Sequence, residues 1–162
     1  MLNAACSDDV ETVVLAARVV ANMALSEDGR AQLVEDDAIS LLVALCKAKE
    51  EPVQANATAA VANLAEDRDM EIELLEKGAV ESLAGNTSSM HDGLVFHSAR
   101  GLLPLTAPPE NRHFVIDKVG LGPFVSLCQH QDMRIKKMGA ECMGNLGVKV
   151  ELAYEAEDSG SD

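Results

Sequence analysis

This sequence of 162 residues contains four cysteines and four histidines, side chains that can bind transition metals or act as nucleophiles and bases. They are Cys6, Cys46, Cys128, Cys142, His91, His97, His113 and His130. A zinc site needs ligands at short, defined spacings such as C-x-x-C or H-x-x-x-H, and neither spacing occurs here. We therefore predict no metal site, and we expect the cysteines to be small buried hydrophobic residues.

Motifs typical of enzymes are also absent. The sequence contains no phosphate-binding loop G-x-x-x-x-G-K-[ST], no dinucleotide motif G-x-G-x-x-G and no nucleophile motif G-x-S-x-G. The sequence therefore predicts a non-catalytic protein with no cofactor.

The charge of the chain argues against two classes of partner. The net charge is −14 and aromatic residues make up 2%, which disfavours binding to nucleic-acid phosphates or stacking on bases. The same charge disfavours docking to an anionic membrane. The charge is uneven, at −11 over residues 1–90, +1 over 91–147 and −4 over 148–162. A protein or peptide is the remaining kind of partner.

One position recurs at equal intervals along the chain, at Asn22, Asn63, Pro104 and Asn145. Around each centre, large apolar residues lie two before and one after it, and small residues lie mainly five and six before it. Offsets of three and four place these side chains on one helical face. The sequence therefore predicts four long helices that pack closely through a seam of small residues.

Two shorter helices are predicted between successive long helices. The first spans residues 29–37, 70–78 and 111–120, and the second spans 38–46, 79–86 and 120–128. Gly78 and Gly120 mark breaks between the two short helices. Each unit therefore contains two short helices and one long third helix.

The unit and its period, about 41 residues, resemble armadillo repeats, the family of beta-catenin and importin alpha. Three segments follow the family pattern: PENRHFVIDKVGLGPFVSL at 109–127, EKGAVESLA at 76–84 and ATAAVANLA at 57–65. The resemblance implies an all-α, right-handed superhelical solenoid over residues 1–147, followed by an acidic, disordered tail over 148–162. We expect an isolated third helix and then three units, the middle one imperfect.

The resemblance also implies a binding surface. In the family's peptide readers, the third helices line a concave groove and the central Asn hydrogen-bonds the backbone of an extended peptide. The sequence carries this residue at Asn22, Asn63 and Asn145 and lacks it at Pro104. An amide suits the role because it offers one acceptor and two donors, like a peptide unit. Alternatively, these side chains only bind neighbouring backbone groups.

Charged residues lie one helical turn before two of the centres. Arg18 and Arg100 are expected to contact ligand carboxylates, and His97 and Lys137 to face the same groove. The importin-alpha branch of the family has Trp where Arg18 and Arg100 lie, and this chain has none. The alternative for each Arg is a solvated or locally paired side chain.

The main prediction is therefore a scaffold or adaptor that binds an extended peptide along this groove. Two other functions remain open. The acidic N-terminal half suits capture of basic peptides, as in importin alpha. Alternatively, the chain is a structural segment of a larger ubiquitin-ligase, cytoskeletal or ciliary assembly that makes contact through its repeat ends.

Irregular features affect the middle and the ends of the array. Pro104 in a long helix and the helix-poor segment 85–93 predict a local kink. The first long helix, residues 10–25, is apolar on more than one face, unlike the polar cap of a solenoid. We therefore expect the chain to continue a longer array or to self-associate through that end.

The sequence also predicts a location. No apolar run reaches the roughly 20 residues of a membrane helix, the N-terminus lacks the basic region of a secretory signal, and Leu2 excludes N-myristoylation. Four cysteines in such a chain favour a reducing cytoplasmic or nuclear environment.

Overall fold

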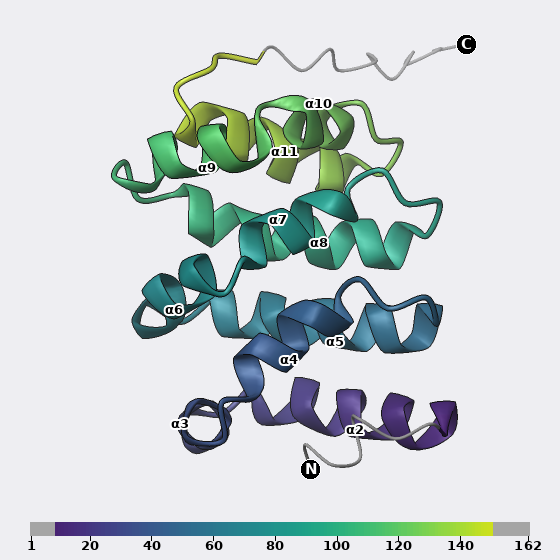
Figure 1. The fold of residues 1–162 in the computed structure, drawn as a ribbon. Helices are drawn as coiled ribbons and strands as arrows, with labels where there is room; N and C mark the ends of the chain where they lie inside the picture. The colour runs from purple at the N-terminus through teal and green to yellow at the C-terminus, as the bar shows by residue number, and fades with distance from the viewer. Residues whose placement is uncertain (1–8, 151–162) are drawn as a thin grey trace, which may run out of the picture.

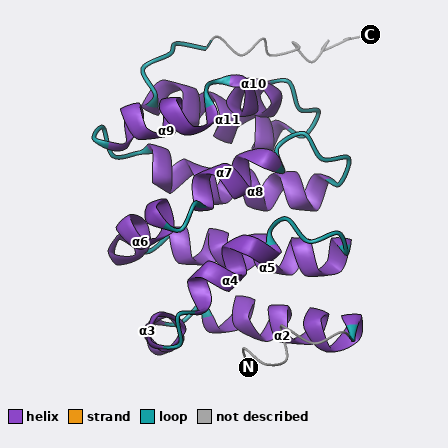
Figure 2. Cartoon of the chain, viewed as in Figure 1, coloured by secondary structure: helices purple, strands orange, loops and turns teal. Residues whose placement is uncertain are grey.

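A computed structural model describes residues 9–150, and the regular elements in this range are helices, with no strand among them (Figure 2). In chain order they are α2 (Val10–Met23), α3 (Glu27–Glu35), α4 (Ala38–Leu45), α5 (Glu51–Ala65), the short 3-10 helix η1 (Arg68–Met70), α6 (Glu71–Glu76), α7 (Ala79–Gly85), α8 (Asp92–Thr106), α9 (Asn111–Val119), α10 (Gly122–Cys128) and α11 (Met133–Asn145).

Local sequence explains where several helices begin. Side-chain oxygens of Asp9, Ser26 and Asp132 accept hydrogen bonds from backbone N–H groups in the first turns of α2, α3 and α11. Each bond satisfies a donor that has no partner within its helix. Pro52 lies in the first turn of α5, where its missing N–H costs nothing.

The breaks between the short helices need an unusual backbone conformation. Gly78 and Gly120 have φ angles of 81° and 67°, which glycine adopts without strain. They lie at the α6–α7 and α9–α10 junctions, as the sequence predicted. Asp37 lies one repeat before Gly78 and has a φ angle of 49° at the equivalent α3–α4 junction. A non-glycine residue is therefore held in a left-handed conformation there.

The helices stack as a solenoid (Figure 1). The third helices α2, α5, α8 and α11 each pack against the next one along the chain, and the second helices α4, α7 and α10 pack against the third helix of their own unit. The units α3–α4–α5, α6–α7–α8 and α9–α10–α11 follow α2 in the order that the sequence predicted.

Small residues allow this close stacking. A Cβ atom added to Gly101 on α8 would lie 3.2 Å from the Ala62 Cα of α5 and 2.9 Å from the Leu83 side chain. A Cβ on Gly139 of α11 would lie 2.6 Å from the Leu127 Cβ of α10. Gly139 belongs to the predicted seam of small residues and meets the second helix of its own unit, whereas Gly101 lies outside the predicted seam and meets the preceding third helix.

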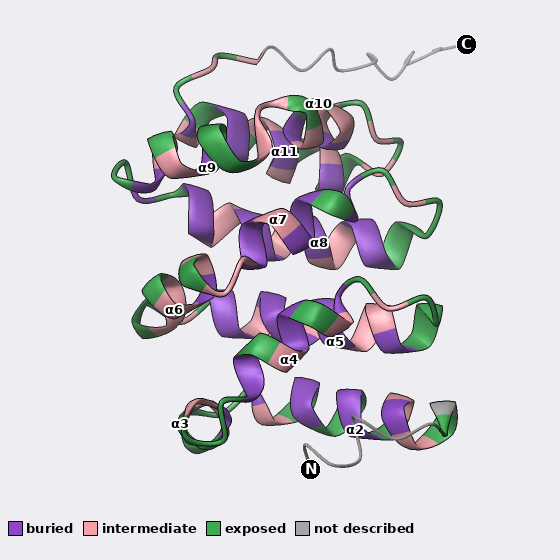
Figure 3. Cartoon of the chain, viewed as in Figure 1, coloured by how far each residue is buried: buried purple, intermediate pink, exposed green. Residues whose placement is uncertain are grey.

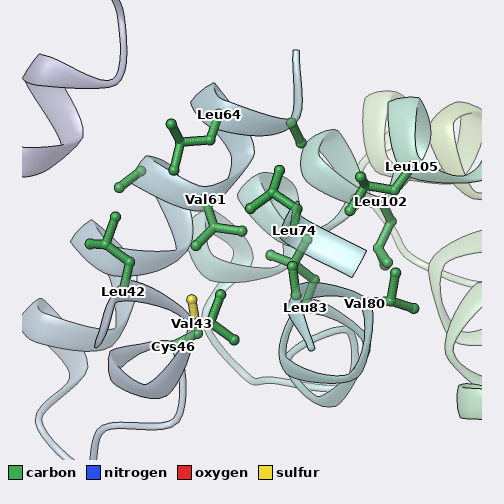
Figure 4. Packing of buried hydrophobic residues seen from close by; sticks show 14 of the residues in the cluster. Leu42, Val43, Cys46, Val61, Leu64, Leu74, Val80, Leu83, Leu102 and Leu105 are labelled. Carbon is green, nitrogen blue, oxygen red and sulfur yellow. The ribbon is translucent and has the colours of Figure 1, made fainter. Parts of the chain in front are cut away.

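One continuous apolar core runs through the stack. The third helices bury the faces that they turn to their neighbours and expose the others (Figure 3). Figure 4 shows the buried residues of two successive units following one another across the view, from Leu42 and Val61 to Leu74 and Leu83 and then Leu102. Because each unit buries its apolar residues against the next, the units stabilise one another.

The irregular middle unit is accommodated without breaking the stack. α8 continues through Pro104 as far as Thr106; the predicted kink stays a prediction. α7 ends at Gly85, and the following Asn86 is 6% exposed. The Asn86 Nδ2 donates to the Cys46 carbonyl (3.0 Å) and to Thr58 Oγ1 (3.3 Å) of the preceding unit. A buried polar contact therefore joins two units where the sequence shows only a helix-poor segment.

Two sequence predictions fall partly outside the described residues. Cys6 and residues 151–162 of the predicted tail lie there. Val148 and Val150, which follow α11, still pack against the core. Within residues 9–150, no helix has the length and apolar character needed to cross a bilayer.

Candidate peptide-binding groove

All seven predicted groove residues lie on third helices. Arg18 and Asn22 are on α2, Asn63 on α5, His97 and Arg100 on α8, and Lys137 and Asn145 on α11. Arg18, Asn22 and Lys137 are exposed, whereas the other four are half-buried. The contacts of the half-buried side chains determine which of their polar atoms a ligand can reach.

Asn63 and Arg100 are brought into direct contact. The Asn63 Nδ2 donates to the Ala21 carbonyl of α2 (3.0 Å), and the Asn63 Oδ1 accepts from the Arg100 Nη2 of α8. The same Nη2 lies 3.4 Å from the Ala59 carbonyl, and the Arg100 Nε lies 3.7 Å from Glu66 Oε1. The contact between Asn63 and Arg100 therefore links three successive third helices.

Asn145 has a partial version of the same arrangement. Its Nδ2 donates to Thr106 Oγ1 of α8 (3.3 Å), which leaves its amide oxygen and one N–H for a ligand. Arg112 of α9 donates to the Asn145 backbone carbonyl from Nε (3.2 Å) and Nη2 (3.1 Å). This pair of bonds holds the C-terminal end of α11 through its backbone and does not involve the Asn145 side chain.

Asn22 differs from both. Its side chain is exposed and has no hydrogen bond to any residue between 9 and 150. Arg18, one turn earlier, is also exposed and forms no ion pair within the same range. The α2 end of the surface therefore offers a whole amide and a whole guanidinium to a ligand.

His97 lies one turn before Arg100 on α8 and is uncharged at neutral pH. Burial, and then the nearby Arg100 cation, lower the pKa of His97, because both disfavour a positive imidazole. Its Nδ1 is buried with no hydrogen-bond partner among the described residues. The ring lies edge-on to Phe96, with centroids 5.6 Å apart.

Phe96 and Arg134 belong to this region although the sequence analysis did not select them. The Arg134 guanidinium of α11 lies over the Phe96 ring at 5.1 Å and forms an ion pair with Asp132 at 2.6 Å. Phe96 occupies the position equivalent to Lys137 in the next unit. The repeat register could have found Phe96, because it places both residues on the same helical face.

A hollow of about 560 Å³ lies beside Asn63, where α2 and α5 end. Its lining residues are Ala24, Leu25, Arg30, Asn63, Glu66, Asp67, Arg68 and Asp69. Arg30 Nε and Asp67 Oδ2 are 2.6 Å apart and only partly exposed. The carboxylates of Glu66 and Asp69 line the same space and give it an acidic side.

Comparison with known proteins agrees with this architecture. The Armadillo/beta-catenin-like repeat family matches residues 26–66. A solved structure of an engineered protein is 27% identical and covers 91% of this chain, with a TM-score of 0.80. A computationally designed armadillo repeat protein for modular peptide recognition is 24% identical over 88% of this chain, with a TM-score of 0.82. Residues 26–66 thus match an armadillo repeat, and the described chain has the fold of armadillo repeat proteins.

Another related structure is a designed armadillo repeat protein in complex with the peptide (KR)4, which is 22% identical over 89% of the chain, with a TM-score of 0.79. The armadillo-like chain spans 61%, 61% and 62% of the lengths of these three structures. No curated protein sequence matches it.

The N-terminal end of this armadillo-like array is a second candidate surface. Val19 on α2 is 45% exposed, whereas the equivalent Ala60, Gly101 and Cys142 of the later third helices are all buried. Leu15, one turn away, is also 45% exposed. In the later units, the preceding third helix and the unit's own short helices cover this position.

The described part of this armadillo-like chain contains no cluster of three or more His, Cys, Asp and Glu side chains that could hold a metal. Cys46 and Cys142 are buried, Cys128 is half-buried, and all three are free thiols. Burial raises the pKa of Cys46 to about 11 and that of Cys142 to about 12. These two thiols are therefore protonated and unreactive at neutral pH.

Proposed function

We propose that this chain is a non-catalytic scaffold or adaptor that binds an extended peptide segment of a partner along the third helices. The observation that carries the proposal is the uncommitted Asn22 amide beside the exposed Arg18, in line with the partly committed Asn63 and Asn145. Amides spaced one unit apart match the repeating donors and acceptors of an extended backbone.

The fold supports this proposal in general terms. Two of the similar structures are described as designed armadillo repeat proteins, one for modular peptide recognition and one in complex with the peptide (KR)4. Solenoids of this kind present an extended concave surface to a partner. We propose His97, Arg100 and Lys137 as further groove residues, and a cytoplasmic or nuclear location, in keeping with the free thiols.

Selection from a library of extended peptides, followed by titration, tests the proposal. The variants are Asn22→Ala, and as a matched control Gln32→Ala, which removes an exposed amide from the short helix α3. We expect Asn22→Ala to weaken binding by about tenfold, the value of one or two hydrogen bonds, and Gln32→Ala to have no effect. Equal effects of the two variants would contradict a groove on the third helices.

Capture of basic peptides is a second candidate, favoured by the hollow beside Asn63. The carboxylates of Glu66 and Asp69 and the apolar Leu25 suit a lysine or arginine side chain. This function predicts that basic peptides bind more tightly than acidic ones. It also predicts that their affinity falls steeply between low and high salt, because exposed charges are screened.

Contact through the N-terminal end is a third candidate, favoured by the exposure of Val19 and Leu15. We propose it as the route by which the chain self-associates or continues into further repeats. Sedimentation velocity of the parent protein and of Val19→Ser tests it. A parent that remains monomeric at high concentration would exclude self-association.

A further inference from the structure

Arg100 controls how much of Asn63 a ligand can reach. In an amide side chain, the oxygen accepts and the nitrogen donates twice. At Asn63 the Arg100 guanidinium takes one lone pair of the oxygen and the Ala21 carbonyl takes one N–H, so one lone pair and one N–H remain. A peptide that approaches the Asn63 oxygen from the side that the Arg100 guanidinium occupies has to displace the guanidinium first.

The repeat itself supplies a comparison, because this contact forms at one step of the array only. The residues equivalent to Arg100 are Arg18, Ala59 and Glu141. Ala59 cannot donate to Asn22 of the preceding unit, and Asn22 is open. Glu141 faces a unit that has Pro104 in place of the Asn. Arg100 is thus the one residue of this set placed to occupy an Asn of the unit before it.

The guanidinium is not fully satisfied by its present partners. Its Nε is buried without a hydrogen bond, and the nearest carboxylate oxygen, on Glu66, is 3.7 Å away. The two acceptors that it does reach, Asn63 Oδ1 and the Ala59 carbonyl, are neutral. A carboxylate that met Arg100 through two parallel N–H···O bonds would be a stronger partner than either.

An incoming carboxylate has to compete with Glu66, which is exposed and 3.7 Å from Arg100, but two other features of the surroundings permit the exchange. The Arg100 side chain is 30% exposed, so a ligand can reach it without unfolding the helix. His97, one turn away, has its pKa lowered and is neutral. It therefore neither repels the Arg100 guanidinium nor neutralises an incoming carboxylate.

From these contacts we infer that Arg100 is a specificity-determining residue, which closes Asn63 in the free protein and releases it when a carboxylate of the ligand binds the guanidinium. The inference rests on the proposed function and adds the ligand class: an extended peptide with an Asp or Glu side chain opposite Arg100. A neutral peptide must break the contact between Asn63 and Arg100 without compensation, so recognition of the acidic side chain and of the backbone are coupled.

Titration of the full chain with two capped peptides, (Glu-Ala)5 and (Gln-Ala)5, tests this inference. We expect the parent to bind the Glu peptide about tenfold more tightly, the value of a charge-assisted hydrogen bond. Arg100→Ala opens Asn63 and removes the cation together. It should therefore bind the Gln peptide several-fold more tightly than the parent does, and the Glu peptide less tightly.

The matched control is Arg18→Ala, which makes the same change at the equivalent position of α2, where no Asn is covered. It should weaken the Glu peptide and leave the Gln peptide unchanged. Ala59 occupies this position in α5, so alanine is compatible with the helix. Arg100→Met, which keeps the aliphatic stem, repeats the test if Arg100→Ala lowers the thermal midpoint.

The outcomes separate the inference from the function on which it rests. Tighter binding of the Gln peptide by both Arg100 variants supports the inference. If Asn22→Ala weakens binding but the Arg100 variants bind the Gln peptide no more tightly than the parent, the inference is wrong and the groove stands. If neither peptide binds the parent or the Arg100 variants, both the proposed function and the inference fail.

Discussion

Replacing Asn86 by Ala should destabilise the protein more than its position in a loop suggests. Asn86 is 6% exposed and donates to the Cys46 carbonyl and to Thr58 Oγ1, both in fully buried residues. Its own oxygen accepts from the Gln54 Nε2 at 3.1 Å. The substitution therefore leaves the carbonyl at the end of α4 without a donor, in a place where water cannot replace it.

The magnitude follows from these partners. A buried acceptor left unpaired costs about 1–3 kcal/mol. Thr58 keeps its hydrogen bond with the Cys46 thiol, and Gln54 is half-buried and can bond water instead. The loss of the Asn86 side chain therefore costs less free energy at these two residues than at the Cys46 carbonyl. We expect the free energy of unfolding to fall by about 2–3 kcal/mol, a large part of the roughly 5–15 kcal/mol of a typical domain. The thermal midpoint should then fall by about 4–12 °C.

Urea denaturation, followed by circular dichroism, measures this loss as a shift of the midpoint at constant slope. Asn56→Ala is the matched control, because the Asn56 Nδ2 only donates to the Pro52 carbonyl of its own helix. It should cost less than about 0.5 kcal/mol. Asn86→Leu introduces the residue found at the equivalent Leu45 and Leu127 and still leaves the Cys46 carbonyl unpaired. A Leu variant as stable as the parent would refute the role of the hydrogen bonds.

Three further predictions use the same denaturation assay. Ser98→Ala should stabilise the protein by about 1 kcal/mol, because the buried Ser98 hydroxyl has no partner among the described residues and the equivalent Ala57 is apolar; destabilisation would reveal a hidden partner. Asp37→Gly should stabilise by up to about 1 kcal/mol, because relief of the left-handed backbone should exceed the loss of the exposed ion pair with Lys77, and a loss of stability would show that it does not. Above pH 9, stability should fall by about 1.4 kcal/mol per pH unit for each buried thiol, because the pKa values of Cys46 and Cys142 are about 11 and 12 in the folded protein and the unfolded chain ionises first. Cys142→Ala should make this fall shallower, and an unchanged slope would contradict the assignment.

The sequence was sufficient to predict the regular part of this fold. Its constant period aligns Asn22, Asn63 and Asn145 and places the helices of each unit, since a repeat has to bury the same face at every step. The same register, applied to Asp37 and Gly78, could also have predicted the left-handed junction at Asp37.

The contacts that distinguish one unit from another could not be predicted in this way. The bonds of Asn86 to the preceding unit and the contact between Arg100 and Asn63 join residues 28 to 40 positions apart. They depend on side-chain rotamers and on local burial, which periodicity does not contain. The residues equivalent to Asn86 in the other two units are Leu45 and Leu127, so the repeat pattern gives no sign of the polar contact that Asn86 forms.

The side-chain hydrogen bonds that join units in the described part of the chain connect residues no more than 42 positions apart. No bond in that range of the chain has to wait for a segment made much later in synthesis. Each unit can therefore dock on the previous one soon after its own last helix has left the ribosome. Synthesis proceeds at roughly 5–20 residues per second, so each unit can be covered by the next within seconds. Apart from the α2 face that exposes Leu15 and Val19, only the newest unit then exposes an uncovered apolar face.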